Sequence, residues 1–378
     1  MVRMSTNTGT LDVPALRARL GRAAEATGKA GVDALVIAPG SDLRYLLGVG
    51  GGSHERLSCL LLPADGVPVL LLPALEAPGY AHLPLAELGV EQRTWVDGED
   101  PFRMAADHLS GAAAFAVSDM MPALHALQLR DALGDARQDL AGPIVRELRM
   151  RKDAAEIEAL AEAGAAIDRV HARMGEWLRA GRTEAEVRAD IAAAIVAEGH
   201  VTAEFVIVGS GPNGASPHHE VSDRVIERGD VVVVDIGGPM PSGYNSDCTR
   251  TYSIGQPSGA GVADAYEILR IAQDAAVRAV RPGVTAESVD DAARSAITAA
   301  GLGEHFVHRT GHGIGLDVHE EPYVVAGNDI PLEPGMAFSV EPGIYLPGRW
   351  GARIEDIVVV TEDGRRSLNN QPHELVVL

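Results

Sequence analysis

The sequence predicts an α/β protein with two domains, and three observations support this prediction. The chain has 378 residues, more than a single hydrophobic core usually organises. Its first ~140 residues alternate between strand-like and helix-like segments, as a small α/β domain does. The remainder contains two similar copies of a helix–helix–strand–strand pattern. We therefore expect an N-terminal domain over residues 1–145 and a larger C-terminal domain over residues 146–378.

The elements of the N-terminal part follow from the spacing of its apolar residues. Residues 57–73 are expected to form a hairpin whose turn lies near Asp65 and Gly66. Gly142 and Pro143 interrupt the pattern before a long helix that starts near Asp153, so the domain boundary is placed near residue 145. Helices are expected at residues 12–30 and 121–133, and further strands at residues 33–38 and 113–119.

The C-terminal part contains an internal repeat. Residues 181–199 and 283–301 share seven of nineteen positions when aligned without gaps. After each copy comes an apolar strand with an acid six residues after its glycine, Asp235 in one copy and Glu341 in the other. A second acidic strand follows in both copies, so we expect two half-domains that face each other. The repeated helices are expected at residues 153–180, 181–199, 262–281 and 283–301.

Charge and cysteine content restrict the partners and the compartment. The formal net charge is −21, which repels nucleic acid and anionic membranes, so neither is expected as a partner. The two cysteines, Cys59 and Cys248, are too few for a disulfide framework and are expected to be free thiols. Residues 1–20 contain no apolar segment of signal-peptide length, and no stretch approaches a membrane span, so we expect a cytoplasmic protein.

Four carboxylates occupy matching places in the two repeats. Asp235 follows a run of four valines and Asp247 begins the next strand, whereas Glu341 follows an apolar strand and Glu355 lies inside one. Any one of these acids alone is more simply a turn residue or half of an ion pair. Four that converge would repel one another strongly unless cations balanced them. Two divalent metal ions would do so, and the pattern predicts a dinuclear site.

The segment from His308 to Pro322 supplies a further ligand. His312 is held between two glycines, and its imidazole would complete an oxygen-rich set. Such a set favours Mn²⁺, with Co²⁺, Fe²⁺ and Zn²⁺ as alternatives, and lacks the thiolates of a structural zinc site. Two ions about 3.5–4 Å apart would activate a water and polarise a substrate carbonyl. The expected metal ligands are Asp235, Asp247, His312, Glu341 and Glu355.

The other histidines of these loops are available to a substrate. His218 lies in a Gly/Pro-rich loop before the Asp235 strand, and His308 and His319 flank His312. Imidazole can donate to a developing oxyanion or relay a proton, so we expect active-site roles for these three. Arg353, expected on the same strand face as Glu355, has two interpretations of equal weight. It either pairs with one of the acids or binds a substrate carboxylate.

Six motifs, taken together and in this order, resemble the pita-bread metallopeptidase family in its Xaa-Pro branch. They are "PHH", "VVVVDIGG", "YNSDCTRTY", "GHGIGLDVHEEP", "SVEPGIY" and "RIEDIVVVT". The segment "PGSDLRYLLG" at residues 39–48 is similar to the creatinase-type N-terminal domain. The resemblance covers nearly the whole chain and is closest to Xaa-Pro dipeptidases (prolidases). It implies a small creatinase-type α/β domain followed by a pita-bread catalytic domain of two pseudo-symmetric halves.

The resemblance also implies roles for individual residues. It assigns the same five metal ligands and makes Glu341 the general base toward a metal-bridging hydroxide. It matches His218 and His319 to histidines that bind substrate and stabilise the tetrahedral intermediate, and His308 and Arg353 to residues that contact substrate. The implied activity is hydrolysis of Xaa-Pro bonds in small peptides by a homodimer. The interval between Asp235 and Asp247 holds one residue more than is commonest in the family, but loop length changes cheaply, so both should remain ligands.

Three alternative functions share this architecture. An Xaa-Pro aminopeptidase would act on longer peptides, and the modest size of the N-terminal part favours the dipeptidase over it. A metal-free creatinase-like hydrolase and a non-enzymatic binding module would both lack the ligand set, which is intact here.

Overall fold

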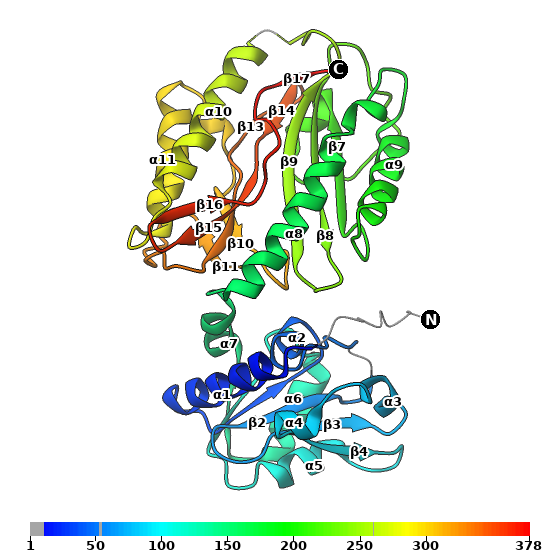
Figure 1. Cartoon of the computed structure of the whole chain (residues 1–378), viewed down its shortest axis with the longest axis vertical. Helices are drawn as coiled ribbons and strands as arrows, with labels where there is room; N and C mark the ends of the chain where they lie inside the picture. The colour runs from blue at the N-terminus through cyan, green and yellow to red at the C-terminus, as the bar shows by residue number, and fades with distance from the viewer. Residues whose placement is uncertain (1–10, 53–54, 260) are drawn as a thin grey trace. The chain divides into compact units, whose positions relative to one another are not determined.

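The computed structural model describes residues 11–52, 55–259 and 261–378. It divides into an N-terminal unit, residues 1–149, and a C-terminal unit, residues 150–378 (Figure 1). The predicted boundary at residue 145 falls inside helix α7 (Gly142–Arg149). Gly142 and Pro143 begin this helix and do not interrupt the chain, because a proline in the first turn lacks only an amide that has no intrahelical partner. No helix in the described ranges has the length and apolarity to cross a membrane.

The N-terminal unit is built on one six-stranded mixed sheet, whose strand order is β4-β3-β2-β1-β5-β6. The expected hairpin is present, because β2 and β3 pair antiparallel with Leu61 opposite Val69. The edge strands β4 and β6 were not predicted, since their sequences are polar and lack an apolar alternation. The strands are β1 (Ala34–Ile37), β2 (Cys59–Pro63), β3 (Val69–Pro73), β4 (Glu91–Trp95), β5 (Ala114–Val117) and β6 (Arg137–Leu140).

The helices of this unit include the two that were expected. Helix α1 begins after Asp12, whose side chain accepts a hydrogen bond from the amide of Ala15. Helices α2 to α5 were missed; α3 and α4 are single turns, too short to show a helical period. The helices are α1 (Val13–Lys29), α2 (Ser41–Leu47), α3 (Ala77–Tyr80), α4 (Leu85–Leu88), α5 (Pro101–His108) and α6 (Ala123–Leu133).

The C-terminal unit repeats its helices. In the first half, α8 (Ala154–His171) has 18 residues and α9 (Glu184–Ala197) has 14. In the second half, α10 (Val262–Ala279) and α11 (Ala286–Ala299) have the same lengths. Helix α8 ends nine residues before the predicted end at residue 180. The apolar residues that prolonged the pattern, Met174, Trp177 and Leu178, are instead buried in and after a 3-10 turn.

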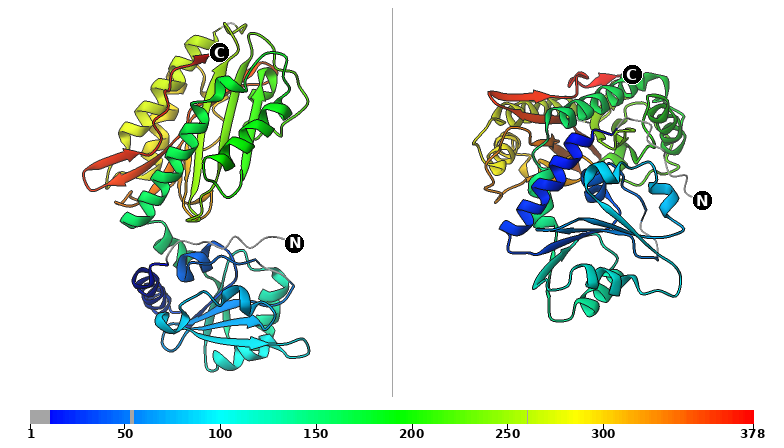
Figure 2. Two further views of the ribbon diagram at one scale, coloured as in Figure 1. Left: turned by 45° about the vertical axis from the view of Figure 1, so that its right-hand side comes forward. Right: turned by 60° about the horizontal axis from the view of Figure 1, so that its bottom comes forward.

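The strands of the C-terminal unit lie between the two pairs of helices (Figures 1 and 2). One sheet has the order β17-β9-β8-β7, a second has the order β11-β10-β12-β15-β16, and β13 pairs with β14. Each half has its own apolar core between helices and strands. The strands are β7 (Phe205–Ser210), β8 (Val231–Pro239), β9 (Asn245–Ser253), β10 (Gly311–Gly313), β11 (Glu320–Val324), β12 (Ala337–Val340), β13 (Gly343–Leu346), β14 (Trp350–Arg353), β15 (Asp356–Thr361), β16 (Gly364–Ser367) and β17 (Val376–Val377).

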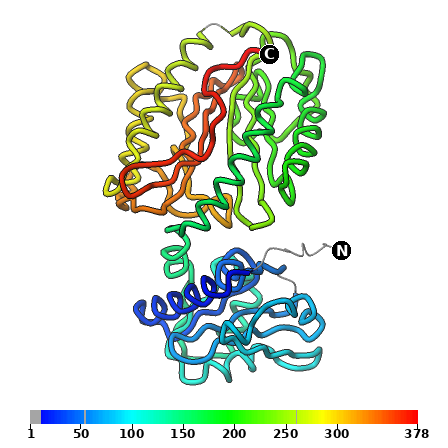
Figure 3. Tube along the Cα trace, viewed as in Figure 1, coloured from blue at the N-terminus to red at the C-terminus, as the bar shows by residue number. Residues whose placement is uncertain are grey.

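Strand β9 joins the two halves. One of its edges pairs with β8, and the other receives residues from later in the chain. The amide of Glu355 donates to the carbonyl of Thr249 at 3.1 Å, and the amide of Asn245 donates to the carbonyl of Gly315 at 3.0 Å. The tube in Figure 3 shows the red C-terminal segment returning beside β9, where β17 pairs with it in parallel.

Candidate metal centre and active site

A single cavity of about 810 Å³ in the C-terminal unit brings together all nine residues that the sequence singled out. A volume of this size suits a small organic ligand. The cavity is lined on one side by residues of β7, β8 and β9 and on the other by residues of the second half. The nine residues are His218, Asp235, Asp247, His308, His312, His319, Glu341, Arg353 and Glu355.

Both aspartates project from the β8–β9 hairpin. Asp235 lies opposite Thr249 in the register and Asp247 lies opposite Gly237, so the two acids are diagonal neighbours on one face of the sheet. Gly237, opposite Asp247, has no space for a side chain, since a Cβ at this position would lie 2.2 Å from the carbonyl oxygen of Ser246. Cys248 projects to the opposite face and is fully buried, as expected of a core residue beside a ligand.

The second half presents its two carboxylates from the ends of strands. His312 lies in the middle of β10, and Glu341 directly follows β12. Glu355 was expected inside a strand, but it lies in a break: β14 ends at Arg353 and β15 begins at Asp356. The chain leaves the β13–β14 pair here and joins the sheet of β12, so Arg353 and Glu355 do not share the face of one strand.

The ligand atoms of Asp247, His312 and Glu355 all lie within 4.8 Å of one another. The Nε2 atom of His312 is 3.2 Å from Oε1 of Glu341 and 3.6 Å from Oδ2 of Asp247. The Nδ1 atom of His312 donates to the carbonyl of Gly313 at 3.1 Å, which fixes the ring with Nε2 toward the carboxylates. Three carboxylates and one imidazole thus face a common point.

Burial and mutual repulsion dominate the electrostatics of this cluster. Burial, with the charges of Glu355, Asp235 and Glu341, raises the pKa of Asp247 well above its ordinary value. Burial and the charges of Glu341 and Asp235 do the same to the pKa of Glu355. Burial opposes the charge of Glu341 too, but the hydrogen bond and charge of His312 outweigh it and lower the pKa of Glu341 to about 2. Such crowding is relieved by a bound cation.

Asp235 gives a further indication of a metal. Its Oδ2 accepts a hydrogen bond from Nη2 of Arg353 at 2.6 Å, whereas its buried Oδ1 has no hydrogen-bond partner among the described residues. Buried carboxylate oxygens are normally satisfied, so a missing ligand is the simplest partner for this atom. The hydroxyl of Thr249 orients Glu355 at 2.6 Å, and that of Ser339 orients Glu341 at 3.0 Å. The residues present therefore fit divalent ions.

Arg353 is almost fully buried, with 2% of its surface exposed. Its guanidinium pairs with Asp235, donates to the hydroxyl of Tyr345 at 2.7 Å, and donates to Thr249 Oγ1 at 3.1 Å. The structure thus contains the expected ion pair of Arg353 with an acid, while a contact between Arg353 and a substrate stays a prediction. The Tyr345 hydroxyl also lies 2.8 Å from Nε2 of His308, whose pKa is lowered by burial. Sequence reasoning missed Tyr345, because no spacing marks it as a partner of both groups.

The remaining histidines approach the cavity from opposite halves. The ring of His319 packs edge-on against that of His312, with centroids 4.1 Å apart. Burial, together with the charges of His312 and Arg309, lowers the pKa of His319 to about 4, so this imidazole is neutral near pH 7. His218 lines the cavity from the loop that follows β7, and its neighbour His219 bonds instead to Glu184 at 2.8 Å.

Apolar side chains form the rest of the wall. Phe205 and Ile207 alternate on β7 and therefore face the same side of the sheet, and Val318 faces the cavity from the loop before β11. Glu204 and Arg309 add one charge of each sign. The sequence analysis did not single out these residues. Apolar residues two positions apart on a strand, such as Phe205 and Ile207, are a pattern that could have indicated them.

Two known domain families match the chain. Residues 158–362 match metallopeptidase family M24, and residues 19–151 match the creatinase/prolidase N-terminal domain. The chain is 61% identical to the probable dipeptidase PepE of Mycobacterium tuberculosis over 95% of its length and 96% of that protein. It is 37% identical to an Xaa-Pro dipeptidase of Lactobacillus helveticus, over 89% and 92% of the two chains. The crystal structure of PepE from Mycobacterium ulcerans superposes with a TM-score of 0.93 at 61% identity, covering 98% and 99% of the chains.

Proposed function

This chain belongs to metallopeptidase family M24, and we propose that it is an Xaa-Pro dipeptidase that works with two divalent metal ions. The observation that carries the proposal is the convergence of four carboxylates and His312 in one cavity, where a buried oxygen of Asp235 has no hydrogen-bond partner among the described residues. The name Xaa-Pro dipeptidase belongs to relatives such as that of Lactobacillus helveticus.

The ions would be held by the five ligands that the sequence indicated. The set is four carboxylates and one imidazole, with no thiolate, and this favours Mn²⁺ over Co²⁺, Zn²⁺ and Fe²⁺. A bound pair of ions supplies an activated water and polarises the substrate carbonyl. The hydroxyls of Thr249 and Ser339 would keep the two glutamate ligands in place while charge shifts during the reaction.

The protein's own groups would move the protons. Glu341 is the general base: its carboxylate takes a proton from the attacking water and passes it to the proline nitrogen of the leaving group. The low pKa of Glu341 in the absence of metal keeps its carboxylate ionised near pH 7. His319, neutral near pH 7, donates a hydrogen bond to the oxyanion that develops on the carbonyl, and His218 assists from the other half.

The cavity wall suits an Xaa-Pro dipeptide. The nitrogen of an Xaa-Pro bond carries no N–H, so recognition rests on apolar contact and on the two charged ends of the substrate. Phe205, Ile207 and Val318 supply the apolar contact. For the substrate carboxylate the candidates are Arg353, already paired with Asp235, and Arg309, which stacks over Tyr323 and forms no ion pair among the described residues. His308 would contact the substrate beside Arg353.

Two parts of the expectation from sequence remain predictions. One is the homodimer, which the resemblance alone implies, and the other is the cytoplasmic location, which the N-terminal segment and the two cysteines predict.

The proposal is tested by activity and metal content together. We expect the purified protein to hydrolyse Ala-Pro, to lose this activity after exhaustive chelation, and to recover it with Mn²⁺. Ala-Pro-Ala-Ala should be cleaved more slowly than Ala-Pro. Full activity after chelation would contradict the metal centre, and faster cleavage of the tetrapeptide would identify an aminopeptidase.

A further inference from the structure

The carboxylate of Glu184 is fully buried at the start of α9 and does not line the cavity. Its Oε1 accepts hydrogen bonds from the amide and hydroxyl of Ser210, at 2.8 and 2.7 Å. Its Oε2 accepts from Nε2 of His219 at 2.8 Å and from the hydroxyl of Ser222 at 2.7 Å. The side-chain amide of Asn213 reaches both oxygens at 3.1 Å. One charged group thus gathers donors from both ends of a loop.

That loop, residues 211–222, carries His218. Ser210 ends β7 before the loop, Asn213 lies in its 3-10 turn, and Ser222 closes it. Within the loop, the amides of Ser216 and His219 bond three residues back and make local turns. Its two ends are linked by the side-chain amide of Asn213, which donates to the hydroxyl of Ser222 at 3.2 Å, and by Arg224, which donates to the hydroxyl of Ser210 at 2.7 Å. Glu184 contacts both ends as well, and it is the group that binds His219, which leaves the adjacent His218 at the cavity.

We propose that Glu184 is a positioning residue that holds His218 at the cavity by anchoring His219 and Ser222. Burial works against a charge on Glu184, but the hydrogen bonds from Ser210, Ser222 and His219 outweigh it and lower the pKa of the carboxyl to about 2. The anchor is therefore an anion at any pH near neutrality, and it lies at a helix N-terminus, where negative charge is favoured.

The second half contains a buried acid with a similar arrangement of hydrogen bonds. Asp290, fully buried on α11, accepts from the amide and hydroxyl of Thr310 at 3.0 and 2.7 Å. It also pairs with Arg294, which donates to the carbonyl of His308 at 2.9 Å. Asp290 lies one helical turn further along its helix than Glu184 does, and therefore on the same helix face. Each half thus uses a buried acid of its second helix to hold the segment that carries its histidines.

The test is the variant Glu184→Gln, which retains the shape of the side chain and removes its charge. We expect kcat/KM for Ala-Pro to fall by about 10- to 100-fold, as a displaced catalytic group would cause. Metal content should match the wild type, because residues 211–222 include none of the proposed ligands. Adding Glu184→Gln to His218→Ala should lower activity little further, since both changes remove the same contribution. Losses that multiply in the double variant would overturn the proposal.

Asp190→Asn is the matched control. Asp190 lies on the same helix and pairs with Arg182 at 2.7 Å, but its side chain is 44% exposed. It loses the same charge, and kcat/KM should stay within about twofold of wild type. An equal loss in this variant would show that charge on α9, not the anchor, is responsible, and would also overturn the proposal.

The activity measurements rest on the proposed function. Hydrogen exchange therefore serves as a second measurement that does not depend on catalysis. Amides of residues 211–222 should exchange faster in Glu184→Gln, with those of β8 and β9 unchanged. If the loop of the variant exchanges as slowly as that of the wild type, the anchor is overturned whatever the activity. If the loop exchanges faster in the variant but the wild-type protein has no peptidase activity, only the proposed function is refuted. If Glu184→Gln does not fold, Ser222→Ala removes one donor to the same carboxylate and is measured in the same way.

Discussion

The two halves of the C-terminal unit share a backbone plan but present their acids differently. Their paired helices have equal lengths, and each second helix begins after a threonine N-cap, Thr183 or Thr285. The first half projects two aspartates from within a regular hairpin. The second half places Glu341 and Glu355 where strands end, and adds His312.

This difference shows that chemistry is less strictly repeated than backbone. An aspartate is short and must start from a strand that already faces the cavity, as Asp235 and Asp247 do. A glutamate is longer by one methylene and can reach the same point from a break in the strand. The repeat therefore indicates where acids converge, while each half meets this requirement with its own geometry.

The largest test of the comparison removes one acid from each half, with Asp247→Asn and Glu355→Gln as separate variants. Each should lower kcat/KM by more than about 100-fold, because loss of a ligand should cost at least as much as loss of the groups that orient one. The measurements are turnover of Ala-Pro and bound Mn²⁺.

Without metal, the same two variants should be more stable than the wild type, although they are less active with metal. Both acids have a raised pKa in the folded state. Their contribution to stability is therefore fully present below the pKa values of the unfolded chain, and it is lost as the pH rises through the pKa values of the folded protein. At about pH 7 the metal-free variants should therefore melt at a higher temperature than the metal-free wild type. A lower melting temperature would indicate that the protein, not the ions, compensates these charges.

A smaller difference between the halves lies at the ends of their first helices. Helix α8 ends in the buried His171, bonded to the hydroxyl of Tyr252 and the carbonyl of Cys248, whereas α10 ends in Ala279. Burial, with the charge of Arg250, lowers the pKa of His171 to about 3. Between this value and the ordinary 6.5 the unfolded chain binds the extra proton, so stability rises with pH over that window.

His171→Gln should flatten this dependence, by up to about 1.4 kcal/mol per pH unit, while keeping a polar side chain in place. Urea unfolding of wild type and variant at about pH 5 and about pH 7, in the same metal state, measures it. Equal slopes in the two proteins would mean that other groups set the acid sensitivity.

The smallest expected effect concerns the helix caps. Thr183 accepts from the amide of Glu186, and Thr285 accepts from the amide of Ser288. Thr183→Ala and Thr285→Ala should each destabilise the fold by about 1 kcal/mol, with kcat unchanged. Denaturant unfolding of the two variants compares the caps directly, and a large cost at one of them alone would show that the halves do not share this feature.

Much of this site could be predicted because its acids occupy equivalent places after glycine and apolar runs. Asp235 and Glu341, each six residues after a glycine, illustrate this, and both line the cavity. The partners Thr249, Ser339 and Tyr345 could not be predicted, since they depend on which strands come together and not on spacing along the chain. The break before Glu355 was also hidden, because "RIEDIVVV" reads as one continuous apolar strand although it belongs to two sheets.

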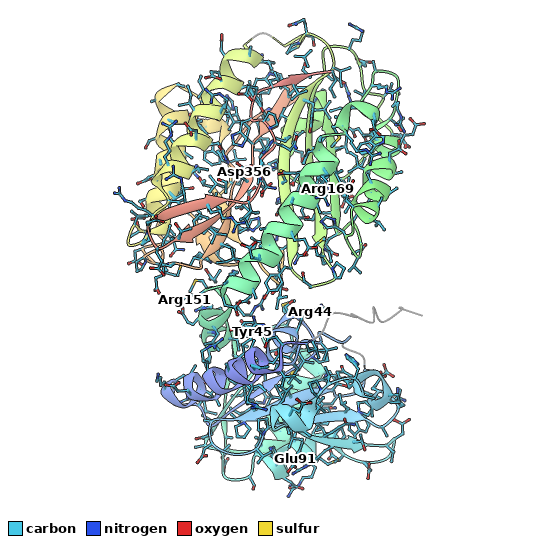
Figure 4. All side chains as sticks on the ribbon, in the orientation of Figure 1. Arg44, Tyr45, Glu91, Arg151, Arg169 and Asp356 are labelled. Carbon is cyan, nitrogen blue, oxygen red and sulfur yellow. The ribbon has the colours of Figure 1, made fainter. Side chains whose placement is uncertain are left out.

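The interior behind the candidate metal centre also contains contacts between the two halves. Arg250 on β9 pairs with the buried Asp356 at 2.7 Å, and His373 bonds to the same carboxylate at 2.7 Å. Asp356, labelled in Figure 4, lies in the interior of the unit next to the ligand Glu355. The pair of Arg250 and Asp356 is thus completed by a residue 106 positions later in the chain.

The far edge of β9 has a consequence for biosynthesis. Its amides and carbonyls meet residues 315, 355 and 376–378, all of which leave the ribosome after the first half is complete. Until then the strand that carries Asp247 is an open edge, able to pair with another chain. The free edge of β9 is therefore covered only when the last residues of the chain have been made.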